Sequence, residues 1–313
     1  MADGRSLGVR DRSTLRRLRT LQTLDEDQIA LVRGLTEALQ GVPGLRAVAL
    51  GGSYARGMAR TDSDIDIGLY YSESAPLCVR AVREVVAGFP GSEGPVVAEL
   101  FEWGPWVNGG AWLTIAGRRV DLIYRSLEHL ERVIVAAERG DHDRDFGQQP
   151  PFGFFGPTYL GELAIAVPLS DPTGRIAALK GRVATYPEAL RRRVVQDYLW
   201  SADFEMHAFA PKFAHRGAIY LTASTIARCV HSLTMALFAL NRRYFVNDKT
   251  ALDETIGFAS CPVGFRGRVE ALLASIGSTP EELEHAVAKA SALCREVVGL
   301  ASEIYVPRFA LVG

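Results

Sequence analysis

Three aspartates lie close together in the stretch GGSYARGMARTDSDIDIGLYY, residues 51–71, just ahead of an apolar run. Asp62, Asp64 and Asp66 occupy alternate positions, and Ile65 separates the last two. Alternate side chains of a β-strand share a face, so we expect Asp64 and Asp66 to point the same way while the isoleucines beside them enter a core. Two carboxylates one pleat apart repel each other, and burying them uncompensated is costly. A divalent cation removes that cost and prefers oxygen ligands, so the pattern predicts a metal site.

Other sites built from similar residues fit this stretch poorly. A calcium-binding loop starting at Asp62 needs glycine at its sixth position, where the chain has Ile67. A phosphate-binding loop of the GxxxxGK[ST] type needs lysine and a hydroxyl residue, where the chain has Met58 and Ala59. The remaining alternative is a polar turn with solvated acids before an ordinary edge strand. That alternative does not explain why the glycines and the acids occur together.

A turn of small residues precedes the acids. Gly51, Gly52 and Ser53 lie between a predicted strand and a short helical segment. Their exposed backbone N–H groups and the Ser53 hydroxyl are suited to hold a triphosphate, and Ser63 is a further phosphate-binding candidate. Metal ions held by the aspartates would bridge the phosphate oxygens and neutralise charge on a leaving pyrophosphate. The stretch therefore indicates a nucleotide-handling site.

The order and spacing of these residues resemble a known family. Gly52-Ser53, ten further residues and then Asp64-Ile65-Asp66 are similar to the signature of the polymerase-beta-type nucleotidyltransferases. Within that superfamily the chain is most similar to the antibiotic (aminoglycoside) nucleotidyltransferases, in which a helical domain follows an N-terminal catalytic domain. The resemblance implies a two-metal Mg²⁺ site at Asp64 and Asp66, with ATP or another NTP as the substrate.

The resemblance also implies a third carboxylate on a later strand, beside the first two. Asp121 is the candidate, because it is the only acid in the apolar run RRVDLIY, residues 118–124. There it would either complete the metal site or accept the proton of the acceptor hydroxyl. An ion pair of Asp121 with a neighbouring arginine is the alternative. Glu99 and Glu102 lie on a neighbouring predicted strand, but their spacing puts them on opposite faces, so at most one would join the site.

Basic residues are the candidates for binding the triphosphate tail. By the resemblance, the helical domain supplies them, and Lys249 or Arg228 would do so here. Arg56 and Arg60 are nearer to the glycine turn in sequence. For all four, a solvated surface charge is the alternative interpretation.

The predicted fold is α+β. A capping Asp25 with Gln28 three residues on predicts the first helix, and strands are expected at 46–50, 65–71, 95–103, 111–115 and 118–124. We expect a catalytic domain at 25–145, a mixed β-sheet with helices on one side. A basic N-terminal arm at 1–24 is expected before the catalytic domain. An all-α helical-bundle domain is expected at 158–313, after a Pro- and Gly-rich linker at 146–157.

Composition limits the class of protein only broadly. The chain has 313 residues, 48% hydrophobic and 23% charged, with a net charge of -1 that draws it to no polyanion. Its four cysteines form no CxxC pair, which favours reduced thiols and a cytoplasmic protein. We expect no membrane span, because no apolar stretch reaches the ~18 residues that a span needs.

The expected activity is metal-dependent transfer of a nucleoside monophosphate, AMP from ATP first, to a hydroxyl of a small acceptor such as an aminoglycoside. Acids near the domain junction (Glu138, Asp141, Asp143, Asp145) would suit a cationic acceptor, or would simply be solvated. Three alternatives stay open: the same chemistry on tRNA or a protein, a non-catalytic nucleotide-binding module, and a structural or interaction protein built around the helical half. Nucleic acid as a partner is possible but not favoured, and the oligomeric state is open.

Overall fold

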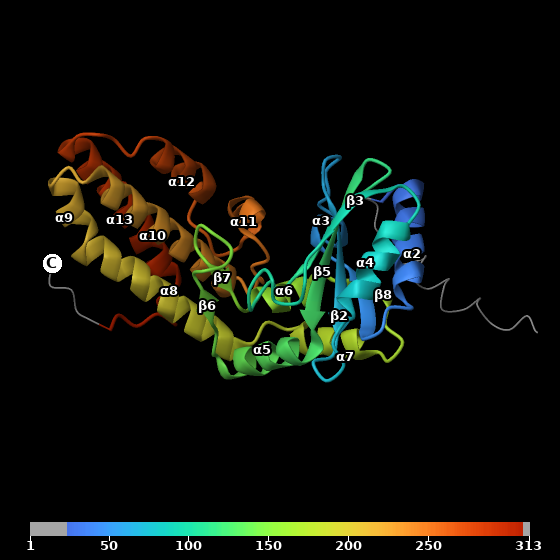
Figure 1. Cartoon of the computed structure of the whole chain (residues 1–313). Coiled ribbons are helices and arrows are strands. Elements are labelled where there is room, and N and C mark those ends of the chain that lie inside the picture. The colour runs from blue at the N-terminus through green and yellow to red at the C-terminus, as the bar shows by residue number, and fades with distance from the viewer. Residues whose placement is uncertain (1–23, 309–313) are drawn as a thin grey trace, which may run out of the picture. The chain divides into compact units, whose positions relative to one another are not determined.

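The computed structural model describes residues 24–308, so the predicted basic arm lies outside it except for Leu24. The described chain forms two compact units (Figure 1). The first comprises residues 24–134 and 159–184, and the second comprises residues 135–158 and 185–308. These boundaries differ from the predicted ones at 145 and 158. Residues 135–158 belong to the second unit, whereas residues 159–184, which follow them, belong to the first.

A six-stranded mixed sheet is the centre of the first unit (Figure 1). Across the sheet the strands are β3 (Ser92–Val97), β4 (Gly110–Ile115), β5 (Arg118–Ser126), β2 (Ile65–Tyr71), β1 (Leu45–Leu50) and β8 (Val167–Ser170). Only β2 and β5 pair in parallel, and every other pair in this sheet is antiparallel. The α+β prediction is confirmed, and β8 is a strand that the sequence analysis did not expect.

One face of this sheet is closed by helices α2 (Glu26–Leu39) and α4 (Val79–Gly88). Helix α2 begins as predicted, with Asp25 and Gln28 forming a reciprocal capping box. Ile65 and Ile67 of β2 are 1% and 0% exposed in the core on this face. Each fully buried side chain of this size contributes ~1.5–3 kcal/mol, so the apolar alternation along β2 fixes which face of the strand is left for Asp66.

The opposite face of the sheet is partly covered by α6 (Thr158–Ile165), whose Glu162 pairs with the buried Arg125 of β5. Helix α7 (Arg175–Val183) follows β8 and completes the first unit. The boundary between the two units falls within α5 (Leu127–Arg139). Helix α6 lies in the range 158–313 that was predicted as the helical domain, but it belongs to the sheet unit.

The second unit is mainly helical. Its elements are α8 (Glu188–Ala208), α9 (Ala210–His215), α10 (Ile219–Leu240), α11 (Asp248–Glu254), η1 (Thr255–Gly257), α12 (Phe265–Ala274) and α13 (Pro280–Leu300). The predicted linker is instead a loop closed by a small hairpin of β6 (Arg144–Asp145) and β7 (Phe154–Phe155), and its Phe152 ring stacks on His231 of α10.

Helix α10 is the one described helix that is long and apolar enough to cross a membrane. Of its most apolar stretch, 67% is buried against the protein, which is the burial of a core helix. The prediction that no apolar segment reaches this length is corrected here: Asn241 ends the apolar run, but the helix begins at Ile219, well before that run.

Candidate functional site

Two of the predicted acids lie side by side on the face of the sheet that points away from α2 and α4, the open face below. Asp66 of β2 and Asp121 of β5 are register partners in the parallel pair. Their neighbours Ile65, Val120 and Leu122 are buried on the core face, so both aspartates project from the other face. Adjacent strands lie ~4.8 Å apart, so two like charges are held close together by the backbone alone.

The glycine turn packs against one of these carboxylates. The Gly51 N–H donates to the Asp66 carbonyl oxygen over 2.8 Å, which joins the end of β1 to β2. Gly52 has φ +59°, and a Cβ placed on it would lie 1.7 Å from Asp66 Oδ2. Only glycine fits both requirements. The close approach explains why glycine at position 52 accompanies aspartate at 66 in the sequence.

Asp64 is held differently from the other two acids. It precedes β2, and its Oδ1 lies 2.6 Å from Nε of Arg119. Arg119 also donates to the carbonyl oxygen of Asp62 over 2.9 Å. Asp64 Oδ1 is buried, and the arginine contact lacks hydrogen-bond geometry, so this oxygen accepts no hydrogen bond from the described residues. Of the two arginines considered as partners for Asp121, Arg119 pairs with Asp64 and Arg118 pairs with Asp25 at 3.1 Å.

The acids fit a hard divalent cation by their chemistry, although the side chains are not gathered around one point. Among residues 24–308, no three His, Cys, Asp or Glu side chains come together as a metal-binding group. The backbone brings Asp66 and Asp121 together, whereas Arg119 holds Asp64 in an ion pair. A glycine that clears room for the Asp66 carboxylate is a feature that oxygen ligation of Mg²⁺ would use.

The predicted nucleotide-binding residues fall in three places. Gly52 and Ser53 begin the short helix α3 (Gly52–Ala55), whose first N–H groups have no partner within the helix. Arg56 is its C-cap. Ser63 Oγ accepts from the Arg60 N–H over 2.9 Å and so closes the turn before the acids. Lys249 is exposed at the second position of α11 and belongs to the second unit, not to the unit that carries the acids.

The alternative acids do not join the site. Glu99 pairs with Arg83 at 2.8 Å, and Glu102 accepts from the Glu99 N–H over 2.6 Å. Both lie in the loop after β3, because that strand ends at Val97. The prediction of a strand reaching residue 103 was wrong, since the chain turns at Phe101, where φ is +65°.

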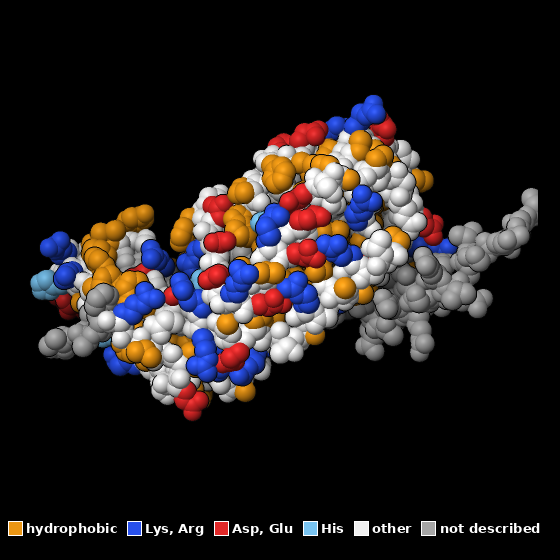
Figure 2. All heavy atoms as spheres, turned by 90° about the horizontal axis from the view of Figure 1, so that it is seen from below, with side chains coloured by type: hydrophobic (Ala, Val, Ile, Leu, Met, Phe, Trp, Pro, Cys, Tyr) orange, Lys and Arg blue, Asp and Glu red, His pale blue; other side chains and the backbone are white. Residues whose placement is uncertain are grey.

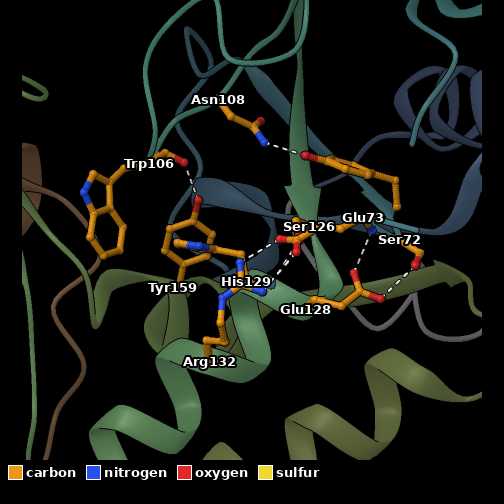
Figure 3. Close-up of polar contacts among 10 residues, drawn as sticks. Ser72, Glu73, Trp106, Asn108, Ser126, Glu128, His129, Arg132 and Tyr159 are labelled. Carbon is orange, nitrogen blue, oxygen red and sulfur yellow. Dashed lines mark hydrogen bonds and ion pairs between the residues drawn. The ribbon is translucent and has the colours of Figure 1, made fainter. Parts of the chain in front are cut away.

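A second polar cluster, which sequence reasoning missed, lies at the carboxyl ends of β2 and β5 (Figure 3). Glu73 accepts hydrogen bonds from Arg132 and from the Ser126 hydroxyl, both at 2.7 Å. These contacts, the arginine first, lower the pKa of Glu73 to about 2. Glu128 accepts from the Ser72 hydroxyl and the Glu73 N–H. Because its charges are mutually satisfied, the cluster anchors the start of α5 rather than presenting a reactive group.

The same unit contains a further charge pair, between the buried Arg125 of β5 and Glu162 of α6. Arg125 donates from Nε and from its Nη2 to the two oxygens of Glu162, at 2.8 and 2.9 Å. Its guanidinium lies 5.0 Å from the centre of the Tyr159 ring, and the Tyr159 hydroxyl donates to the Trp106 carbonyl oxygen (Figure 3). Burial raises the pKa of the neighbouring Tyr70. The partners lie on different elements, so no local motif revealed them.

Comparisons with known proteins support a nucleotidyltransferase domain in the first part of the chain. Residues 33–141 match the family model described as a nucleotidyltransferase domain, and this range contains Gly51, Gly52, Asp64, Asp66 and Asp121. Residues 159–249 match a domain of unknown function, DUF4037. No curated protein matches the chain. Among solved structures, it is similar to a nucleotidyltransferase-like protein from Exiguobacterium sibiricum 255-15, at 10% identity and a TM-score of 0.44, over 87% of this chain and 78% of that one.

Proposed function

We propose that the chain is a metal-dependent enzyme that transfers a nucleoside monophosphate, AMP from ATP as first choice, to a hydroxyl of a small acceptor such as an aminoglycoside. The nucleotidyltransferase domain at residues 33–141 supports the general reaction. The observation that carries the proposal is the pairing of Asp66 with Asp121 on the open face, beside a glycine that leaves room for the Asp66 carboxylate.

In this reaction the acceptor oxygen forms a bond to the α-phosphorus of the NTP. The bond from that phosphorus to the oxygen bridging to the β-phosphate breaks, and pyrophosphate leaves on the opposite side. When bound, Mg²⁺ supplies charge neutralisation at the phosphate oxygens. Asp64 and Asp66 would hold it, which requires Asp64 to exchange Arg119 for the metal. Asp121 would join them or accept the proton of the acceptor hydroxyl.

The remaining predicted residues have supporting roles in the proposal. The N–H groups of Gly52 and Ser53 would donate to the triphosphate, and the Ser63 hydroxyl would help to orient it. Arg56, the C-cap of α3, would neutralise the β- and γ-phosphates. These roles would place the anionic phosphates at the Gly51–Ser53 turn, beside Asp66.

Within residues 24–308, no observation favours nucleic acid as the acceptor over a small molecule. On the face drawn in Figure 2, Lys and Arg side chains lie among Asp and Glu side chains rather than in a patch of one sign. The net charge of -1 agrees with that mixture. RNA therefore enters the experiment as a comparison acceptor.

The test is pyrophosphate release from each of the common NTPs with Mg²⁺ and a panel of aminoglycosides, lincosamides and RNA. We expect release with a small hydroxylated acceptor, and a fall of about 100-fold or more for Asp66→Asn, which keeps the shape but removes the charge. Asp62→Asn is the matched control, because Asp62 belongs to the same acid run but is 75% exposed and paired with Arg60. Equal activity of wild type and Asp66→Asn would refute the proposed chemistry.

A further inference from the structure

A tryptophan lies next to the paired aspartates, Asp66 and Asp121, on the open face of the sheet. In the middle of β4, Trp112 pairs directly with Asp121 of β5 and, on its other side, with Val96 of β3. Directly opposite residues of an antiparallel pair have Cβ atoms ~4.5–5.5 Å apart on one face, so the indole and the carboxylate are immediate neighbours. Trp112 is 53% exposed, whereas Ala111 and Leu113 beside it are buried in the core.

A second indole supports this one. The ring of Trp103, from the loop between β3 and β4, stacks on Trp112 with centroids 4.7 Å apart and planes at 18°. Gly110 makes room for it, because a Cβ there would lie 3.0 Å from the Trp103 ring. Stacking limits the rotamers of Trp112 and gives its ring a fixed plane. Trp112 nonetheless remains 53% exposed, so the indole is accessible to a ligand on this face.

The order of side chains across the sheet assigns the indole to one side of the reaction. From β4 through β5 and β2 to β1, the residues in order are Trp112, Asp121, Asp66 and the glycine turn that follows β1. If the triphosphate lies at the glycine turn, its pyrophosphate leaves toward that end. An in-line displacement brings the attacking oxygen from the opposite end, which is where Trp112 lies.

We propose that Trp112, held in place by Trp103, is the floor of the acceptor subsite and takes an amino sugar or aminocyclitol ring. This inference rests on the proposed function and names the residue that would hold the acceptor at the same site. The apolar C–H face of such a ring packs on the indole, and Trp is the best aromatic partner for an ammonium group. The adjacent Asp121 carboxylate favours the same cation. A neutral ring would gain the packing alone.

The test is calorimetric titration of the full chain with kanamycin, a cationic polyol built from amino sugar and aminocyclitol rings, with maltose as the neutral comparison. We expect Trp112→Ala to weaken kanamycin binding about tenfold and Trp112→Phe to restore most of it. Tyr220→Ala, which removes an aromatic side chain that is 80% exposed on α10 of the second unit, should leave binding unchanged. ATP binding should be the same in all four proteins.

The outcomes separate this inference from the proposed reaction. Kanamycin binding that does not depend on Trp112, tighter binding of maltose, or no binding of kanamycin by the wild type would each overturn the acceptor subsite. A loss of ATP affinity instead of kanamycin affinity in Trp112→Ala would also overturn it, because the indole would then stack on the base. Trp112-dependent binding with no pyrophosphate release would refute only the reaction.

Discussion

Gly52 gives the sharpest perturbation of the site, because one added methyl group should displace a carboxylate. Gly52→Ala places a Cβ 1.7 Å from Asp66 Oδ2, where ordinary contacts begin beyond 3 Å, so the carboxylate must move by more than an ångström. Misplacement by ~1 Å at a reacting centre reduces rates by ~100-fold, equivalent to ~2.7 kcal/mol. Alanine at φ +59° adds ~1–2 kcal/mol of backbone strain to the folded state.

A second glycine separates the two effects. Gly57 has φ +68°, and a Cβ placed there meets nothing within 4 Å. We expect Gly57→Ala and Gly52→Ala to lower the unfolding temperature by a similar few degrees, since both carry the backbone strain. Only Gly52→Ala should lose ~100-fold in kcat/KM, measured by pyrophosphate release. Equal losses of activity in the two variants, or full activity of Gly52→Ala, would refute the view that the glycine makes room for a working carboxylate.

Three further predictions concern the charges of the sheet unit. Glu162→Ala should lower the free energy of unfolding by ~3 kcal/mol in urea titrations, because it leaves the guanidinium of Arg125 buried and unpaired; a double variant with Arg125→Met should lose less than the single one. The pKa of Glu73 is lowered to about 2, so its stabilisation is complete above the unfolded value near 4.5 and disappears as pH falls through 2. Glu73→Gln should therefore be less stable than wild type by up to ~1 kcal/mol at pH 6, and the difference should vanish toward pH 2 in acid unfolding curves; a constant difference would contradict this. Arg119→Ala should tighten Mn²⁺ binding a few-fold in a metal titration, because it frees Asp64; weaker binding would show that Arg119 helps to build the site.

The sequence predicted those parts of the fold that short-range patterns determine. Asp25 and Gln28 located the start of α2, because both halves of a capping box lie within one turn. The alternation around Ile65 located β2 and the face on which Asp66 lies. A position of Asp121 beside Asp66 was expected from the family resemblance rather than from a local pattern, and the two residues are register partners in the sheet.

Features that depend on distant partners could not be predicted in the same way. Strand β8, Val167–Ser170, is too short to show a period, and it is a strand only because β1 offers it an edge. The contact of Arg119 with Asp64 joins residues 55 positions apart in the chain, and nothing local distinguishes this arginine from its neighbour. The stack of Trp103 on Trp112 needs the loop between β3 and β4 to turn back over the sheet.

Binding of Mn²⁺, followed by electron paramagnetic resonance with a non-hydrolysable ATP analogue present, tests the central claim most directly. Mn²⁺ replaces Mg²⁺ at oxygen ligands and reports occupancy without any need for an acceptor. Wild type and Asp62→Asn should bind the ion with equal affinity, whereas Asp66→Asn and Asp121→Asn should each bind it at least tenfold more weakly. Equal binding by all four proteins would contradict the assignment of the paired aspartates to a metal-dependent nucleotide site.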